Sequence, residues 1–128
     1  MKVKCIAVIC LIMILINGCA AEVWTGEAVI SEGRLCETTT GFQKLCQLTE
    51  KNGAYLTFRV ENNGGTTVVL FIDEGERLIL EPGMSGQVTA KVRDFLIFSR
   101  EFWVKCCTVR GGDVMDITYR LYQHSMEG

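Results

Sequence analysis

The chain is poor in the residues from which catalytic sites are built. Its 128 residues include one histidine, His124, close to the C-terminus, where we expect the chain to fray and a catalytic base to be poorly held. The segment GMSG at 83–86 departs from the G-x-S-x-G nucleophile elbow, because Gln87 stands where that motif ends in glycine. These absences favour a protein without enzymatic activity and without a cofactor.

Basic clusters are lacking as well. The chain has 13 lysines and arginines against 15 acidic residues, and the two signs are interspersed, as on an ordinary solvated surface. Without a basic cluster, little would displace counterions from a phosphate backbone. Nucleic acid is therefore not an expected partner.

A hydrophobic run long enough to span a membrane is also missing. The longest apolar run covers residues 6–16, about eleven residues, whereas a spanning helix needs about twenty. The run follows Lys2 and Lys4 and precedes small residues, which is the layout of an export signal. We expect this segment to be removed from the mature protein, which then carries 11 basic and 15 acidic residues and a net charge of −4.

Residues 16–19, with the sequence INGC, resemble the lipobox of bacterial lipoprotein precursors. The resemblance implies that 1–18 form a signal peptide, that Cys19 is the lipid-attachment site, and that 19–22 form a short tether. Lipid chains would hold the protein on the extracytoplasmic side of a membrane in the cell envelope. The alternative is an ordinary signal peptide cut after Ala20, which would leave a secreted protein.

Four further cysteines, Cys36, Cys46, Cys106 and Cys107, form an even set in a chain that is expected to be exported. Such a set favours disulfides, with three possible pairings. Zinc is disfavoured because thiolate ligands come in closely spaced pairs, whereas here nine residues lie between the first two cysteines and the last two are adjacent. Neighbouring residues on a strand point to opposite faces, so one of the last two should face the core. Acidic turns remain an alternative cation site, for calcium, although we expect them to be solvated and expect no metal.

The rest of the chain has the two-residue periodicity of β-strands. In the segment 54–60, the apolar residues Leu56, Phe58 and Val60 alternate with more polar ones, which predicts one buried face. The segment 66–72 is almost continuously apolar and predicts a central strand. The predicted strands are 23–30, 54–60, 66–72, 77–81, 87–92, 102–109 and 114–122, and the ambiguous segment 94–100 could be an eighth.

Turn signals separate these segments. Pro82-Gly83 predicts a type II turn, because proline presets φ at the second position and glycine accepts a positive φ at the third. Seven or eight short strands with such turns predict one all-β domain over 23–128, a small antiparallel β-sandwich. The layout resembles the immunoglobulin-like and fibronectin-like domains of bacterial surface proteins, which implies their architecture and no particular ligand.

Tyr55, Arg59, Arg120 and Tyr122 lie on strand faces that are predicted to be exposed. If both strands belong to one sheet, these residues form an aromatic and basic patch suited to a carbohydrate or to a peptide strand. The sequence alone does not show whether the two strands meet.

Aromatic residues also anchor protein partners. Trp24 is one candidate, and strand alternation places one of Phe102 and Trp103 in the core and its neighbour on the surface. We therefore expect a non-catalytic binding or accessory protein that engages a protein partner close to the membrane. The alternative is a carbohydrate-binding module that uses Tyr55 and Tyr122.

Overall fold

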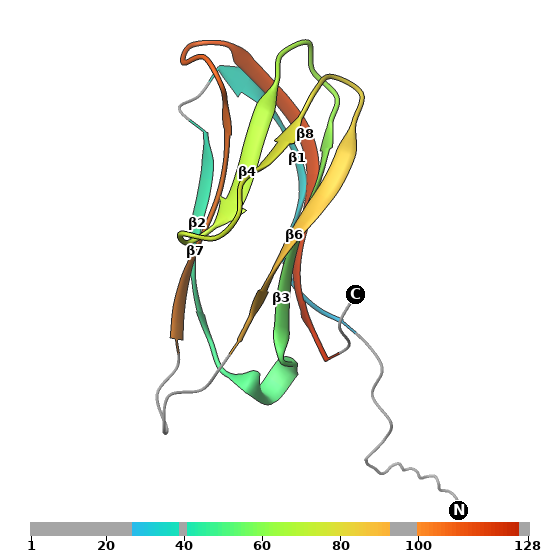
Figure 1. Ribbon diagram of the computed structural model, residues 1–128. Helices are drawn as coiled ribbons and strands as arrows, with labels where there is room; N and C mark the ends of the chain where they lie inside the picture. Colours follow the sequence, from blue (N-terminus) through green and yellow to red (C-terminus); the bar gives the residue numbers. More distant parts are fainter. Residues whose placement is uncertain (1–26, 39–40, 93–99, 126–128) are drawn as a thin grey trace, which may run out of the picture.

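The computed structural model describes residues 27–38, 41–92 and 100–125. They form two antiparallel four-stranded sheets that pack as a small β-sandwich (Figure 1), which confirms the predicted fold class and the expected number of strands. The elements are β1 (Ala28–Thr38), β2 (Phe42–Leu48), the 3-10 helix η1 (Glu50–Asn52), β3 (Tyr55–Asn62), β4 (Val68–Ile72), β5 (Leu78–Leu80), β6 (Ser85–Lys91), β7 (Arg100–Thr108) and β8 (Val114–His124). Within these ranges, no helix is long and apolar enough to cross a bilayer.

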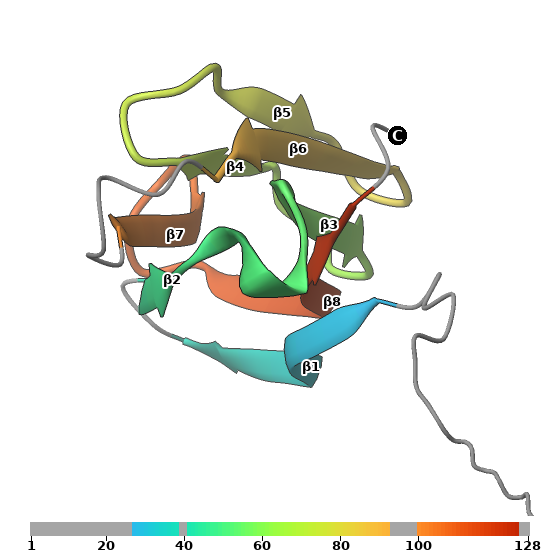
Figure 2. The same cartoon turned by 90° about the horizontal axis from the view of Figure 1, so that it is seen from below.

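The strands are ordered β1-β8-β3-β6 in sheet A and β2-β7-β4-β5 in sheet B. In the end-on view, β1 and β2 lie at one side of the sandwich, and β5 and β6 lie at the other (Figure 2). Except for the β4–β5 hairpin, consecutive strands alternate between the sheets, and the first strand pairs with the last. This order is that of an eight-stranded jelly roll and differs from the immunoglobulin order suggested by the layout of the sequence.

The core lies between the two sheets and comes mainly from the interior strands. Leu56, Phe58 and Val60 of β3 are wholly buried, as their alternation predicted. The predicted central strand is confirmed, because β4 lies between β7 and β5. The fully buried core also includes Val68, Leu70, Leu80, Val92, Phe102, Val104, Cys106, Met115, Ile117 and Leu121.

Two of the four edge strands, β1 and β2, differ from the prediction. β1 begins at Ala28 and continues to Thr38, beyond the predicted end at residue 30, and β2 was not predicted. The two strands lie at the edges of their sheets, so each pairs with one interior strand and leaves many side chains in solvent. Their main chains are held by pairing with β8 and β7, which requires no strict apolar alternation. Residues 23–26 of the first predicted strand and 93–99 lie outside the described residues.

The predicted turn at Pro82-Gly83 is confirmed. The Met84 N–H donates to the carbonyl oxygen of Glu81 at 3.0 Å, and Gly83 has a φ of 87°, as the third position of a type II turn requires. The turn carries the chain from β5 in sheet B to β6 in sheet A. The Asn62 N–H donates to the carbonyl oxygen of Met84, and the Gly83 N–H donates to the carbonyl oxygen of Asn62, at 2.9 Å each. These two hydrogen bonds attach the turn to the end of β3.

Candidate binding surfaces

The four residues of the predicted patch lie on the outer face of sheet A. β3 and β8 are neighbours in that sheet, and their register places Arg59 opposite Arg120 and Thr57 opposite Tyr122. Tyr55 precedes Thr57 by two residues and therefore points to the same face. The structure thus brings Tyr55, Arg59, Arg120 and Tyr122 onto one surface, which meets the geometric condition for a single patch.

His124 completes the aromatic part of this surface. It is the last residue of β8, is only 9% exposed, and lies opposite Tyr55 in the register. Its ring centroid lies 5.8 Å from that of Tyr55 and 5.1 Å from that of Tyr122. The expectation of a frayed end was wrong, because strand pairing and two ring contacts hold His124 in place. Its distance from the C-terminus was the only signal in the sequence, and it was misleading.

The imidazole of His124 also contacts a hydroxyl group. Its Nε2 lies 2.7 Å from Oγ1 of Thr57, which in turn lies 2.8 Å from Oγ1 of Thr89 on β6. Thr57 was predicted to be exposed but is wholly buried, on the outer side of β3. This pair therefore presents no accessible nucleophile to a substrate, and its contacts join the three strands β8, β3 and β6.

The two arginines that face each other have different electrostatic partners. Arg120 forms ion pairs with Glu27 and Glu32, and its guanidinium lies 4.8 Å from the ring centroid of Tyr122. Arg59 is exposed and makes no ion pair with any residue that the structure describes. One guanidinium of the patch is therefore neutralised, and the other can still meet a polar or acidic ligand.

A shallow depression of about 460 Å³ lies beside the two arginines. It has two arginines and two glutamates among its lining residues, so its formal charges balance. The lining residues are Glu32, Gly33, Arg59, Glu61, Thr118, Tyr119 and Arg120.

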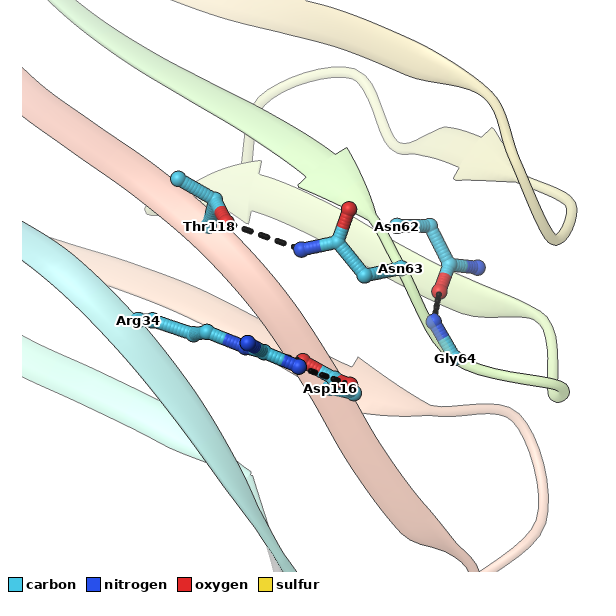
Figure 3. Close-up of polar contacts among 6 residues, drawn as sticks. All are labelled: Arg34, Asn62, Asn63, Gly64, Asp116 and Thr118. Carbon is cyan, nitrogen blue, oxygen red and sulfur yellow. Dashed lines mark hydrogen bonds and ion pairs between the residues drawn. The ribbon is translucent and has the colours of Figure 1, made fainter.

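A second polar cluster lies further along β8 (Figure 3). Arg34 of β1 donates from Nε and Nη2 to the two carboxylate oxygens of Asp116, at 2.9 and 2.8 Å. Hydrogen bonding from Arg34 holds the pKa of the Asp116 carboxyl below its ordinary value. The side-chain amide of Asn63 donates to Oγ1 of Thr118 at 2.8 Å. These groups satisfy one another, so the cluster ties β1 and the turn after β3 to β8.

The four described cysteines are free thiols, so the structure does not contain the expected disulfides. Cys36 is exposed on β1, whereas Cys46 and Cys106 are buried. Cys46 pairs with Phe102, four residues from Cys106, so the two buried thiols lie at different levels of the β2–β7 ladder. The prediction that Cys106 and Cys107 differ in burial is confirmed, because only Cys106 is fully buried.

Burial changes the chemistry of these thiols. Desolvation raises the pKa of Cys106 to about 12, and it also raises the pKa of Cys46. Neither thiol is therefore a ready nucleophile at neutral pH. In the described ranges, His, Cys, Asp and Glu side chains form no group that could hold a metal ion. Cys19 lies outside these ranges.

Sheet B carries an exposed apolar surface that the sequence analysis did not find. We call it the apolar face, and it consists of Leu45 on β2, Val69 and Phe71 on β4, Ile79 on β5 and Trp103 on β7. Leu45 lies opposite Trp103, and Val69 lies opposite Ile79. Leu45, Trp103 and Ile79 are 41%, 42% and 60% exposed. Apolar side chains from four adjacent strands therefore meet solvent together.

Two cations lie over the aromatic rings of the apolar face. The guanidinium carbon of Arg77 lies 4.1 Å from the ring centroid of Phe71. Lys105 Nζ lies 5.9 Å from the ring centroids of both Phe71 and Trp103. Aromatic residues and arginine are also the residue types enriched in the energetically important parts of protein interfaces.

Strand alternation correctly indicated that one of Phe102 and Trp103 is buried. Phe102 is 1% exposed, and Trp103 is on the surface. The rest of the apolar face was missed because β2 was not predicted, so Leu45 was not assigned to any strand or sheet face. The spacing of Phe42, Cys46 and Leu48 on a single strand face was the available signal. Trp24, the other tryptophan candidate, lies outside the described residues.

Comparison with models of known protein families gives no match for this chain, and no curated protein matches it. A jelly roll supports many unrelated activities, so the fold does not identify a function. The functional argument therefore depends on the surfaces described above.

Proposed function

We propose that this chain is a non-catalytic binding protein that holds a protein partner through the apolar face of sheet B. The observation that carries the proposal is the exposure of Leu45, Trp103 and Ile79 on one face of sheet B, where Val69 and Phe71 of β4 lie between the strands of Trp103 and Ile79. A group of large apolar side chains on one face marks an interaction surface, whereas isolated exposed apolar residues are ordinary. An exposed tryptophan with a cation near its ring, as Lys105 is here, is a residue type that often anchors a protein partner.

The absence of enzymatic activity is part of this proposal. The only histidine of the chain is held against the wholly buried Thr57, and the pKa of the buried Cys106 is too high for a reactive thiolate at neutral pH. Both groups are thus built into the framework of the sandwich. Neither arrangement provides the accessible nucleophile and base that acyl transfer requires.

The proposed location is the extracytoplasmic surface of a membrane, with a lipid on Cys19 as the anchor and 1–18 removed. The support is the lipobox-like sequence INGC at 16–19. Intact-mass analysis of the protein from its native producer tests it. A mass of residues 19–128 plus acyl chains is expected, and an unacylated chain that starts near Ala21 would show a secreted protein instead.

Photo-crosslinking tests the binding function. A photoreactive amino acid in place of Trp103 should give crosslinked protein adducts in the producing cells. The matched control is the same substitution at Val114, which is 51% exposed at the start of β8, outside the apolar face. Equal adducts at the two positions, or none at position 103, would contradict the proposal.

Proximity to the membrane is a separate part of the proposal. The first strand begins at Ala28, nine residues after Cys19, and extended residues reach about 3.5 Å each, so a lipidated domain would start no more than about 30 Å from the anchored residue. Insertion of a flexible linker after Glu22 should reduce adducts with a partner embedded in the same membrane. Unchanged adducts would argue against a membrane-proximal partner.

Carbohydrate binding is the second candidate, and it uses the outer face of sheet A. The observation that favours it is the gathering of Tyr55, Arg59, Arg120 and Tyr122 on two adjacent strands. Aromatic rings can stack on sugars, and Arg59 has no acidic partner among the described residues. A glycan array tests this function: binding that is lost in Tyr55→Ala and Tyr122→Ala would support it, and no binding by the native protein would remove it.

A further inference from the structure

The apolar face has an asymmetric distribution of charge along β7. Glu101, Trp103 and Lys105 alternate with the buried residues of this strand, so all three point outward. Glu101 accepts a hydrogen bond from Nε2 of Gln47 at 3.0 Å, which directs the carboxylate along the face. Along β7, Trp103 therefore separates the negative end of the apolar face from its positive end.

The neighbouring strands extend the same pattern. Arg77 lies over Phe71, and Phe71 is the register partner of Lys105, so the two cations share one half of the face. Asp73 lies beside Trp103: its N–H donates to the Trp103 carbonyl oxygen, and its carboxylate oxygen Oδ1 accepts from the Trp103 N–H, at 2.7 Å each. Glu74 follows it in the β4–β5 turn. The acidic residues therefore begin at the level of Trp103, and the cations lie on its other side.

We propose that the apolar face is covered by a second copy of this chain, in a two-fold dimer centred on Trp103. A two-fold axis that lies between the facing sheets and runs perpendicular to β7 reverses the direction of that strand. It places Glu101 against the partner's Lys105, and Lys105 against the partner's Glu101. Trp103 and Leu45 meet their own counterparts, as in any isologous interface.

This charge pattern selects a second copy over other occupants. A bilayer with an anionic surface would attract the half with Lys105 and repel the half with Glu101. A partner of uniform charge would be disfavoured in the same way, whereas the two-fold pairs Glu101 with the partner's Lys105 at two places in the interface. The apolar centre would provide most of the affinity, and the flanking charges would set the register.

The proposal rests on the proposed function, since it names the protein that the apolar face binds. Sedimentation equilibrium of the purified full-length protein, at about 1 to 100 µM, tests it. The native protein should be a dimer with a dissociation constant within or below this range. A monomer throughout the range would overturn the proposal.

Charge reversal gives the decisive comparison. Glu101→Lys places two lysines opposite each other twice in the dimer, and Lys105→Glu does the same with two glutamates, so each variant should dimerise at least about tenfold more weakly. An equimolar mixture of the two variants should form a heterodimer of nearly native affinity, because every facing pair is again opposite in sign. The double variant Glu101→Lys with Lys105→Glu should dimerise as the native chain does.

The matched control is Lys51→Glu, which makes the same change of charge at an exposed position of η1, outside sheet B, and should leave the dimer intact. Thermal unfolding of each variant shows that the fold is retained, which is expected because Glu101 is exposed and Lys105 is only partly buried. Single variants that dimerise as tightly as the native chain, or a mixture that stays monomeric, would overturn the two-fold arrangement.

The outcomes also separate this proposal from the proposed function. If the purified chain is monomeric while position 103 crosslinks to a different protein in the producing cells, the apolar face binds protein and the dimer is wrong. If position 103 crosslinks to nothing and the chain is monomeric, both proposals fail. Adducts between two identical chains at position 103, together with rescue in the mixture, would support both.

Discussion

The side-chain amide of Asn62 donates to the main-chain carbonyl oxygen of Leu80 at 3.0 Å, and so joins the end of β3 in sheet A to the end of β5 in sheet B. The same amide nitrogen donates to the carbonyl oxygen of Thr66 at 2.8 Å, and its oxygen accepts from the N–H of Gly64 at 3.1 Å. Asn62 is only 1% exposed. One buried side chain therefore satisfies main-chain groups in the loop after β3 and at the end of β5.

Loss of this side chain should destabilise the sandwich. Asn62→Ala leaves two carbonyl oxygens and one N–H without their partner in a buried region, so we expect a decrease in unfolding free energy of about 2–3 kcal/mol. Urea unfolding followed by tryptophan fluorescence measures it. Asn63→Ala is the control, because it removes one exposed hydrogen bond and should cost less than about 1 kcal/mol. Equal effects of the two variants would contradict the role of Asn62.

Gly53 is required by close packing of main chains. It has a φ of 128°, and a Cβ at this position would overlap the main-chain carbonyl group of His124. Gly53→Ala should therefore lower the unfolding free energy by about 3 kcal/mol or more. Gly65→Ala is the matched control, because a Cβ there meets no atom within 4 Å. A loss at Gly53 no larger than that at Gly65 would mean that the contact relaxes without penalty.

Asp116 should make stability depend on pH in the acid range. Its pKa in the folded state is lowered from 3.8, first by the hydrogen bond from Arg34, so the folded protein favours the charged carboxylate more than the unfolded chain does. The stabilisation is present above 3.8 and is lost as the pH falls through the lower, folded-state pKa. We expect the native protein to be more stable than Asp116→Asn at pH 6, with the difference shrinking below 3.8. If the difference in stability between the native protein and Asp116→Asn did not change with pH, the charge on Asp116 would not contribute to the stabilisation by Arg34.

The thiols should differ strongly in reactivity. Cys36 is exposed, whereas Cys106 is buried and its pKa is raised to about 12. Brief alkylation of the folded protein without reductant, followed by peptide mass spectrometry, should modify Cys36 first and leave Cys106 unmodified until the chain is unfolded. A disulfide between any of Cys36, Cys46, Cys106 and Cys107 in the protein from its producer would contradict the thiol state.

Interior strands could be predicted because burial against the core requires a recognisable pattern of apolar residues in their sequences. β3 and β8 in sheet A, and β4 and β7 in sheet B, are paired on both edges. Their core-facing side chains must be apolar, so their sequences carry alternation or continuous apolar runs. The Pro82-Gly83 turn was predictable for the same kind of local reason, since its backbone angles suit these two residues.

The edge strands β1 and β2 and both candidate surfaces were decided by tertiary structure, whereas the edge strands β5 and β6 were predicted beside the Pro82-Gly83 turn. β1 and β2 are fixed by pairing with β8 and β7 and need no regular pattern of their own, so one was misplaced and the other missed. His124 was taken for part of a mobile end because its contacts with Tyr55 and Thr57 come from a strand about seventy residues away in the chain.

By itself, the sequence determined that this chain is an all-β sandwich with turns at defined positions, because periodicity and turn chemistry are local properties. Only the tertiary structure decided the jelly-roll order of the strands, the separation of the four cysteines, the meeting of Arg59 with Arg120, and the exposure of Leu45 beside Trp103. Each of these depends on which strand lies next to which. That choice is made by the packing of the whole core, and no short segment of the sequence records it.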